Sequence, residues 1–143
     1  MNYAACTHPG RVRANNEDAY LIDAELGLFI IADGMGGHQA GDVASQIAVE
    51  TVHQQITKGI SKVSVDRGEL LQTAILQAHK AVRRAAEAEL SRRGMGTTLV
   101  VALLGSSRRR LWLANVGDSR AYLLRSGQLR QLTEDHTMRQ HMI

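Results

Sequence analysis

Four short clusters of polar residues have the types and spacing to do chemistry, and each lies where an apolar run meets a loop. They are Arg13 with Asn16-Glu17-Asp18, Asp33-Gly34, Gly96-Thr97-Thr98, and Gly117-Asp118-Ser119-Arg120. Carboxylates, backbone carbonyls and water are hard oxygen ligands, which suit magnesium or manganese and suit zinc poorly. Together the clusters indicate a divalent-cation site, although each one alone is equally compatible with an ordinary solvated loop or turn.

The most informative of these clusters follows the apolar run 28–32 and reads Asp33-Gly34-Met35-Gly36-Gly37. A strand that delivers a carboxylate into a glycine-rich turn can hold a metal ion against exposed backbone carbonyls. A dinucleotide-binding fingerprint that began at Gly34 would need glycine where Gln39 stands, and no Walker-type Gly-Lys-Ser/Thr occurs. No His-Glu-x-x-His pattern occurs either, which argues against a zinc site.

The elements that must position these clusters follow from hydrophobic periodicity. The pattern predicts short strands at 3–7 and 19–23, and a strand at 28–32 that is buried on both faces because it is apolar throughout. Apolar residues at three- and four-residue steps predict a helix over 40–56, with its N-terminus pointing back at the Asp33 turn.

A second helix is predicted from the capping-box spacing of Asp66 and Glu69 to about Arg93, where Gly94 ends it. From residue 97 the pattern is typical of strands, with a hairpin turn at Ser126-Gly127 and a looser turn over 106–110. The strand ranges are 97–104, 111–116, 121–125 and 128–132. Strands, two helices and then a strand meander form an α+β order.

Size and composition indicate one globular domain, since the chain has 143 residues and 44% hydrophobic content. No apolar stretch is long enough to span a bilayer and no signal-peptide pattern opens the chain, so we expect a cytoplasmic protein without membrane association. The single cysteine, Cys6, agrees with a reducing compartment. It lacks the arginine of cysteine phosphatases, because Val12 stands six positions later, and is interpreted as a small buried hydrophobe.

The net charge of +3 does not indicate nucleic-acid binding. The basic residues form short groups without interleaved aromatic residues, which are only 3% of the chain, and ordinary solvated helix faces and a turn account for them. These groups are Arg83-Arg84, Arg92-Arg93 and Arg108-Arg109-Arg110.

Five motifs in order along the whole chain resemble the bacterial form of the PPM-type, or 2C-like, metal-dependent serine/threonine protein phosphatases. The motifs are Gly10-Arg11-Val12-Arg13 with Asn16-Glu17-Asp18, Ala32-Asp33-Gly34-Met35-Gly36-Gly37-His38 with Gly41 and Ala44-Ser45, Gly94-Met95-Gly96-Thr97-Thr98, Asn115-Val116-Gly117-Asp118-Ser119-Arg120-Ala121-Tyr122, and Leu132-Thr133-Glu134-Asp135-His136.

The resemblance implies a β-sandwich flanked by helices (αββα), of which 1–143 is the N-terminal and central part, with two or three Mn²⁺ or Mg²⁺ ions at one end. It implies that Asp33 bridges two metals, that the Gly34 carbonyl completes one shell and that Glu17 binds directly or through water. Asp118 matches the acidic residue that helps to hold a third metal, and Asp18 supports the nearest ligands.

In the implied mechanism, paired cations activate a water for in-line attack on phosphoserine or phosphothreonine, without a covalent enzyme intermediate. Arg13 grips phosphate oxygens with its planar guanidinium. Where some eukaryotic relatives have a histidine as candidate general acid, this chain has Met35, so water or another group, such as His38, protonates the leaving oxygen. The implied partners are phosphorylated proteins, as in bacterial signalling by serine/threonine kinases.

The resemblance stops before the family's later motifs, an Asp-Gly at a strand end and an Asp-Asn, because the chain ends at His141-Met142-Ile143. We therefore expect a fold that is incomplete at its C-terminal end, with a partial metal shell and exposed sheet surfaces that favour self-association. The alternative to an active phosphatase is a truncated, catalytically deficient module that binds phosphoproteins or another partner.

Overall fold

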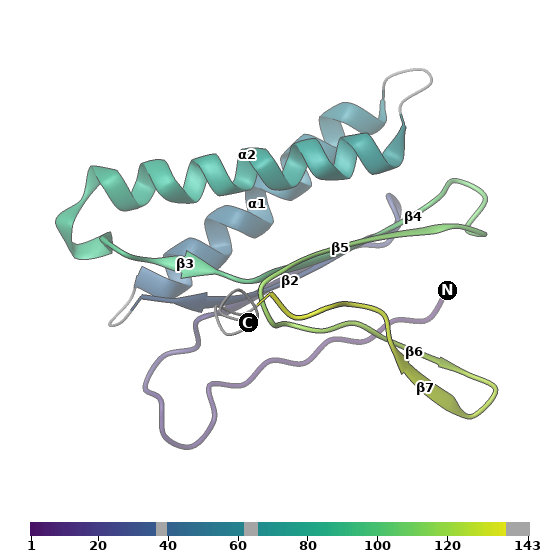
Figure 1. The fold of residues 1–143 in the computed structure, drawn as a ribbon, viewed down its shortest axis with the longest axis horizontal. Helices are drawn as coiled ribbons and strands as arrows, with labels where there is room; N and C mark the ends of the chain where they lie inside the picture. Colours follow the sequence, from purple (N-terminus) through teal and green to yellow (C-terminus); the bar gives the residue numbers. More distant parts are fainter. Residues whose placement is uncertain (37–39, 62–65, 137–143) are drawn as a thin grey trace, which may run out of the picture.

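Two long helices cover one face of an antiparallel β-sheet in the computed structural model, which describes residues 1–36, 40–61 and 66–136 (Figure 1). The elements, in chain order, are β1 (Asp18–Asp23), β2 (Leu28–Met35), α1 (Ala40–Ile60), α2 (Arg67–Ala88), a short 3₁₀ helix η1 (Leu90–Arg92), β3 (Gly96–Thr97), β4 (Leu99–Leu104), β5 (Leu111–Val116), β6 (Tyr122–Arg125) and β7 (Gln128–Gln131). The predicted α+β order is confirmed, and no helix in these described ranges is long and apolar enough to cross a membrane.

The main sheet has the strand order β1-β2-β4-β5, and β3 extends the pairing of β2 on the β4 side. The expected strand over 97–104 is interrupted at Thr98, but β3 and β4 pair with β2 in one continuous register: Gly34 lies opposite Thr97 and Ile31 lies opposite Val100. The β1–β2 register places Asp18 directly opposite Asp33. The sheet therefore brings the acidic residues of two strands together at one end.

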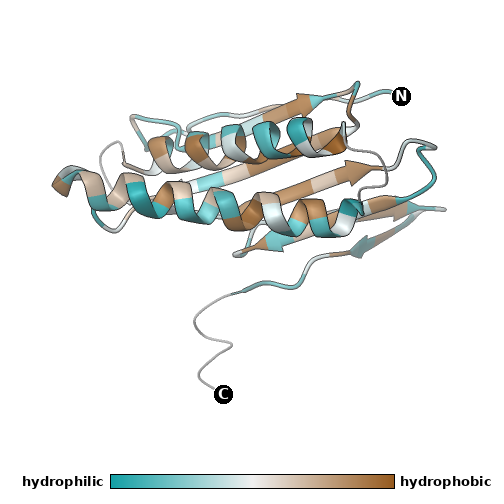
Figure 2. Cartoon of the chain, turned by 90° about the horizontal axis from the view of Figure 1, so that it is seen from above, coloured by the Kyte–Doolittle hydropathy of each residue, from teal (hydrophilic) through white to brown (hydrophobic). Residues whose placement is uncertain are grey.

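The hydrophobic core consists of buried residues of the two helices and of the sheet strands that they cover. Figure 2 shows the helices lying over strands that are coloured mainly as hydrophobic. Along β2, residues alternate between the helix-covered face and an open face: Leu28 and Ile30 are buried, Phe29 is half-buried and Ile31 is 46% exposed. The prediction that this strand is buried on both faces is therefore wrong. Its continuous apolar run serves an antiparallel sheet that the described chain covers fully on one face only.

Both helices pack their apolar stripes on the sheet and on each other. The predicted start of α2 is confirmed, because the Asp66 side chain accepts a hydrogen bond from the Glu69 backbone N–H at 2.9 Å. The helix ends at Ala88, five residues before the predicted end at Arg93, and Glu89 is already extended. Residues 87–90 are exposed, so further helical turns would bury no apolar surface.

A carboxylate fixes the chain where β1 ends, at the opposite end of that strand from Asp18. The Asp23 Oδ1 accepts the Leu26 backbone N–H at 3.0 Å, and its Oδ2 lies 3.0 Å from Nε2 of His53 on α1. These hydrogen bonds, first that from Leu26 and then that with His53, hold the pKa of the Asp23 carboxyl below its ordinary value. The contact ties the β1–β2 turn to the helix layer.

The chain continues from the sheet into a separate hairpin, β6–β7, on the side away from the helices (Figure 1). Its turn is confirmed at Ser126-Gly127, where both residues have positive φ values, 51° and 77°, as a tight primed hairpin turn requires. The looser turn between β4 and β5 is also confirmed, closed by a bond from Gly105 N–H to the Arg110 carbonyl at 2.9 Å.

Two predictions for the N-terminal segment are wrong. Residues 3–7 form no strand: they are exposed, and the segment touches the sheet through an edge-on contact between Tyr3 and Phe29, without a backbone ladder. Apolar alternation alone cannot supply the partner strand that pairing needs. Cys6 is exposed rather than buried because it lies in this segment.

Candidate metal centre

The two acidic residues opposed by the β1–β2 register, Asp18 and Asp33, lie on the open face of the main sheet and are both exposed. Directly opposed residues of antiparallel strands have Cβ atoms about 5 Å apart, at which two carboxylates repel each other. A cation between or beside them removes this repulsion. The donor set at this point of the sheet thus fits a hard divalent cation.

The charges around Asp33 identify its neighbours. The pKa of the Asp33 carboxyl is raised above its ordinary value, first because the group is partly removed from water and then because of the negative charge of Asp18. The positive charge of Arg13 opposes this rise, and Asp118 adds to it. Three other predicted site residues, Arg13, Asp18 and Asp118, thus lie near enough to Asp33 for their charges to change the pKa of its carboxyl.

Hydrogen bonds fix the backbone of Asp33 to the next strand. Its N–H donates to Oγ1 of Thr98 at 3.0 Å, and its carbonyl accepts the Thr98 N–H at 2.9 Å and the Thr97 hydroxyl at 3.0 Å. The Thr98 Oγ1 also lies 2.6 Å from Oγ of Ser119. The interruption between β3 and β4 is therefore the point where a side chain replaces a backbone acceptor and links Asp33 to the loop of Asp118.

Gly34 and Glu17 meet where β2 passes the start of α1. The Gly34 N–H donates to the Glu17 carbonyl at 3.1 Å, and the buried Ser45 hydroxyl donates to the same carbonyl at 2.7 Å. A Cβ at Gly34 would overlap the Gly41 carbonyl and lie 2.7 Å from the Glu17 carbonyl oxygen. Only glycine allows this approach of strand, loop and helix.

The Glu17 carboxyl itself lies against the first turn of α1, because a Cβ at Gly41 would lie 2.8 Å from its Cδ. A negative charge is favoured there by the helix dipole. Arg13 lies exposed in the loop before β1, and Asp118 is exposed in the loop after β5. The structure thus places all the predicted residues, Arg13, Glu17, Asp18, Asp33, Gly34 and Asp118, on segments that meet at one end of the main sheet.

Within 1–36, 40–61 and 66–136, no group of three or more His, Cys, Asp or Glu side chains is arranged to hold a metal ion. The described residues therefore offer an opposed pair, Asp18 and Asp33, with other donors around it, and not a closed ligand shell. His38, the alternative proton donor, lies outside the described residues.

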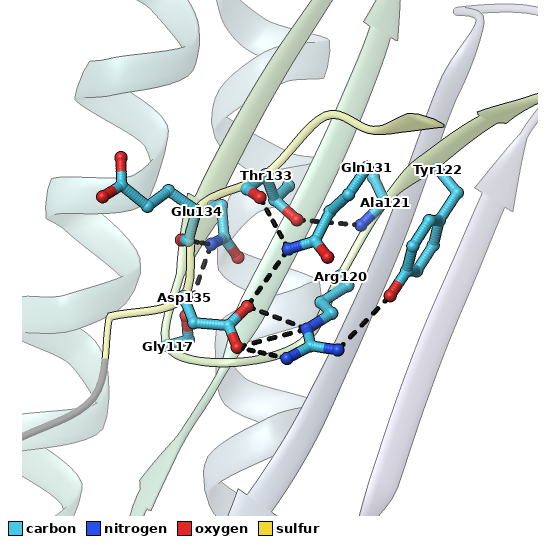
Figure 3. A network of polar contacts seen from close by, with 9 residues as sticks. Gly117, Arg120, Ala121, Tyr122, Gln131, Thr133, Glu134 and Asp135 are labelled. Atoms are coloured by element: carbon cyan, nitrogen blue, oxygen red, sulfur yellow. Dashed lines mark hydrogen bonds and ion pairs between the residues drawn. The ribbon is translucent and has the colours of Figure 1, made fainter. Parts of the chain in front are cut away.

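Sequence reasoning missed a polar network beside this end of the sheet, which joins the loop of Asp118 to the residues after β7 (Figure 3). Its centre is an ion pair between Arg120 and Asp135 with contacts of 2.6 to 3.2 Å. Both residues belong to the motifs quoted above, but their sequence separation of 15 gave no signal that they pair.

The sequence matches the protein phosphatase 2C family over residues 9–141. It is 42% identical over 136 residues to a serine/threonine phosphatase, stp, of Listeria innocua, covering 92% of this chain and 53% of that protein. It is 40% identical over 148 residues to the serine/threonine protein phosphatase PstP of Mycobacterium tuberculosis, covering 100% of this chain and 26% of that protein.

The fold agrees with these relatives. The crystal structure of the catalytic domain of a serine/threonine protein phosphatase PstP with two manganese ions superposes with a TM-score of 0.80 at 40% identity, covering 93% of this chain and 55% of that domain. The class defined by the fold is thus that of the α+β catalytic domains of bacterial serine/threonine protein phosphatases. The chain belongs to the protein phosphatase 2C family. It spans about half the length of the Listeria relative and corresponds to the N-terminal part of the shared domain.

Proposed function

We propose that residues 1–143 form the N-terminal and central part of one PPM-type domain, and that they supply part of the metal and phosphate site of a serine/threonine protein phosphatase. The observation that carries the proposal is the register of β1 and β2, which sets Asp18 and Asp33 side by side on the open face, within the electrostatic reach of Arg13 and Asp118.

Each residue has a distinct role in this proposal. Asp33 is the bridging ligand, the Gly34 carbonyl and Glu17 complete the donor set around it, Asp118 holds a further ion, and Asp18 supports the ligands. Divalent cations, Mn²⁺ or Mg²⁺, supply an activated water and neutralise phosphoryl charge when bound. Support for manganese comes from PstP, whose catalytic domain binds two such ions.

The substrate side of the site is assigned to Arg13. Its positive charge reaches Asp33, where it opposes the rise in the pKa of that carboxyl, and a planar guanidinium can donate two parallel hydrogen bonds to phosphate oxygens. The proposed substrates are proteins phosphorylated on serine or threonine by bacterial kinases, in the cytoplasm. The exposed thiol of Cys6, the single cysteine, agrees with that reducing compartment.

A second candidate is a catalytically deficient module that binds phosphoproteins without hydrolysing them. One observation favours it: the described residues contain no group of three metal-binding side chains. A cation held by few protein ligands keeps most of its water and binds weakly.

The deciding experiment is Mn²⁺ binding by calorimetry together with hydrolysis of p-nitrophenyl phosphate and a phosphothreonine peptide, with Mn²⁺, Mg²⁺ or chelator. Asp33→Asn is compared with Glu50→Gln, a matched loss of charge at an exposed position of α1. We expect Asp33→Asn to remove Mn²⁺ binding and any turnover while the circular dichroism spectrum is retained.

The outcomes separate the candidates. Metal-dependent turnover that Asp33→Asn removes supports the phosphatase, whereas Asp33-dependent Mn²⁺ binding without turnover supports the deficient module. A folded chain whose Mn²⁺ binding is the same in wild type and Asp33→Asn contradicts the metal site in this chain.

A further inference from the structure

The five residues after β7, 132–136, form no helix or strand, yet they are held firmly against the loop that follows β5. We call this segment the strap. The Leu132 N–H donates to the Ala121 carbonyl at 2.8 Å, and the Thr133 Oγ1 accepts the Ala121 N–H at 3.1 Å. The Asn115 amide donates to the Glu134 carbonyl at 2.8 Å. Single backbone bonds together with side-chain bonds, and not a strand ladder, therefore set the path of the strap.

The ion pair of Arg120 and Asp135 is the strongest of these contacts. Nε of Arg120 lies 2.9 and 3.2 Å from the two Asp135 carboxylate oxygens, and its Nη2 lies 2.6 Å from Oδ2. Figure 3 shows the guanidinium and carboxylate facing each other in this fork-like arrangement. The Gln131 side chain donates to the Thr133 carbonyl at 2.8 Å and lies 3.4 Å from Oδ1 of Asp135. Such paired charge-assisted bonds fix orientation as well as distance.

The strap in turn holds the turn 117–119, which carries Asp118. The Gly117 carbonyl accepts the backbone N–H of His136, at the end of the strap, at 2.9 Å and the Asn115 amide at 3.3 Å. Gly117 has a φ of 93°, and a Cβ there would lie 2.8 Å from Cγ2 of Thr98. The turn is thus pressed against Thr98 on one side and tied to the strap on the other.

Thr98 connects this turn to Asp33, since its Oγ1 contacts both the Ser119 hydroxyl and the Asp33 N–H. Asp118 stands between two residues, Gly117 and Ser119, that are fixed from opposite sides. Removal of the strap would take away the His136 N–H bond and leave the Gly117 carbonyl with the longer bond from the Asn115 amide, at 3.3 Å, alone.

We propose that Arg120 and Asp135 are positioning residues: their ion pair anchors the strap, and the strap holds the Asp118 carboxylate in place relative to Asp33. The proposal rests on the proposed function in that it gives Asp118 a role in holding a cation. In this reading the Leu132-Thr133-Glu134-Asp135-His136 motif serves the metal centre without contributing a ligand to it.

A purely structural role predicts different behaviour. Exposed ion pairs contribute little to global stability, and the side chains of Arg120 and Asp135 are 48% and 20% exposed. If the pair has a positioning role, breaking it should reduce the order at Asp118 and change the unfolding midpoint little. If the pair has a purely structural role, breaking it should lower the unfolding midpoint and leave the order at Asp118 unchanged.

The first test uses the 143-residue chain without metal and measures ¹⁵N heteronuclear NOEs. We expect Arg120→Ala and Asp135→Ala to lower the NOEs of the Asp118 and Ser119 amides but not those of β2. The control Arg130→Ala, an exposed arginine on β7, leaves them unchanged. The charge swap R120D/D135R restores order. Unchanged NOEs in both single variants would overturn the proposal.

The second test measures Mn²⁺ affinity in a double-mutant cycle with Asp118→Asn. Loss of a residue that orients a metal ligand weakens metal affinity about 10- to 100-fold, so we expect Arg120→Ala to do so when Asp118 is present and to have no further effect in Asp118→Asn. If Arg120→Ala weakens Mn²⁺ binding equally in the wild-type chain and in the Asp118→Asn variant, Arg120 does not act through Asp118 and the proposal is refuted. Absence of Mn²⁺ binding by wild type would count against the proposed function, while the NOE test still decides the positioning role.

Discussion

Substitution of Gly34 by alanine tests the close packing of β2, the loop before β1 and the start of α1. The added Cβ overlaps the Gly41 carbonyl and lies 2.7 Å from the Glu17 carbonyl oxygen, so the strand and helix must separate. Overpacking costs about 1–3 kcal/mol, and loss of the 3.1 Å bond from Gly34 N–H to Glu17 adds about 0.5–1.5 kcal/mol.

Together these terms amount to roughly 2–4 kcal/mol, which lowers the thermal midpoint of a chain of this size by roughly 6–12 °C. The assay is thermal unfolding followed by circular dichroism. Gly96→Ala is the matched control on β3, because its Cβ would meet only the flexible Met35 side chain, whose terminal Cε is the nearest atom at 3.2 Å. A Gly34→Ala midpoint within 2 °C of wild type, on the order of the assay's own scatter, would refute the packing argument.

Three further predictions concern stability. Asp23→Asn should flatten the loss of stability as the pH falls below about 4, because the lowered folded-state pKa of Asp23 gives stability that is present above its unfolded pKa, about 3.9, and is lost as the pH falls through the folded-state pKa; equal slopes of urea midpoint against pH over that range would contradict this. Leu103→Ala, at a fully buried position, should cost about 2–5 kcal/mol in urea unfolding, and a loss under about 1 kcal/mol would show that the core is misassigned. Thr98→Val should cost about 1–3 kcal/mol, since it leaves the Asp33 N–H without its acceptor, whereas Thr98→Ser should largely retain stability.

Periodicity was sufficient to predict the elements whose patterns are strong. It predicted β5 with the observed bounds, and the cap at Asp66 and the turn at Ser126-Gly127 followed from local chemistry that acts over two to four residues. Periodicity failed where contacts between distant segments determine whether a residue is buried or a strand is paired. The apolar run of β2 could not reveal that the described residues cover only one face of the strand fully, and the segment 3–7 has strand-like residues but pairs with no strand in the described part of the chain.

For the candidate site, likewise, the sequence indicated which residues are involved but not how they are arranged. The acidic residues could be selected from sequence because carboxylates beside glycine turns are chemically distinctive. Their mutual placement could not, since it depends on strand register: a slip of one residue would turn Asp33 away from Asp18 to the other face. The Thr98–Ser119 contact and the Arg120–Asp135 pair join residues 21 and 15 positions apart, for which local patterns carry no information.

The strand order of the main sheet has a consequence for how the chain folds. The β1–β2, β4–β5 and β6–β7 pairs are hairpins between consecutive strands, whereas β2 and β4 are joined across the whole helical segment. Closing that loop costs chain entropy before any contact across it forms, so docking of β4 on β2 should be the slow kinetic step. Because Thr98 is bonded to Asp33 across this same seam, the candidate metal centre should assemble late in folding, after the hairpins and helices exist.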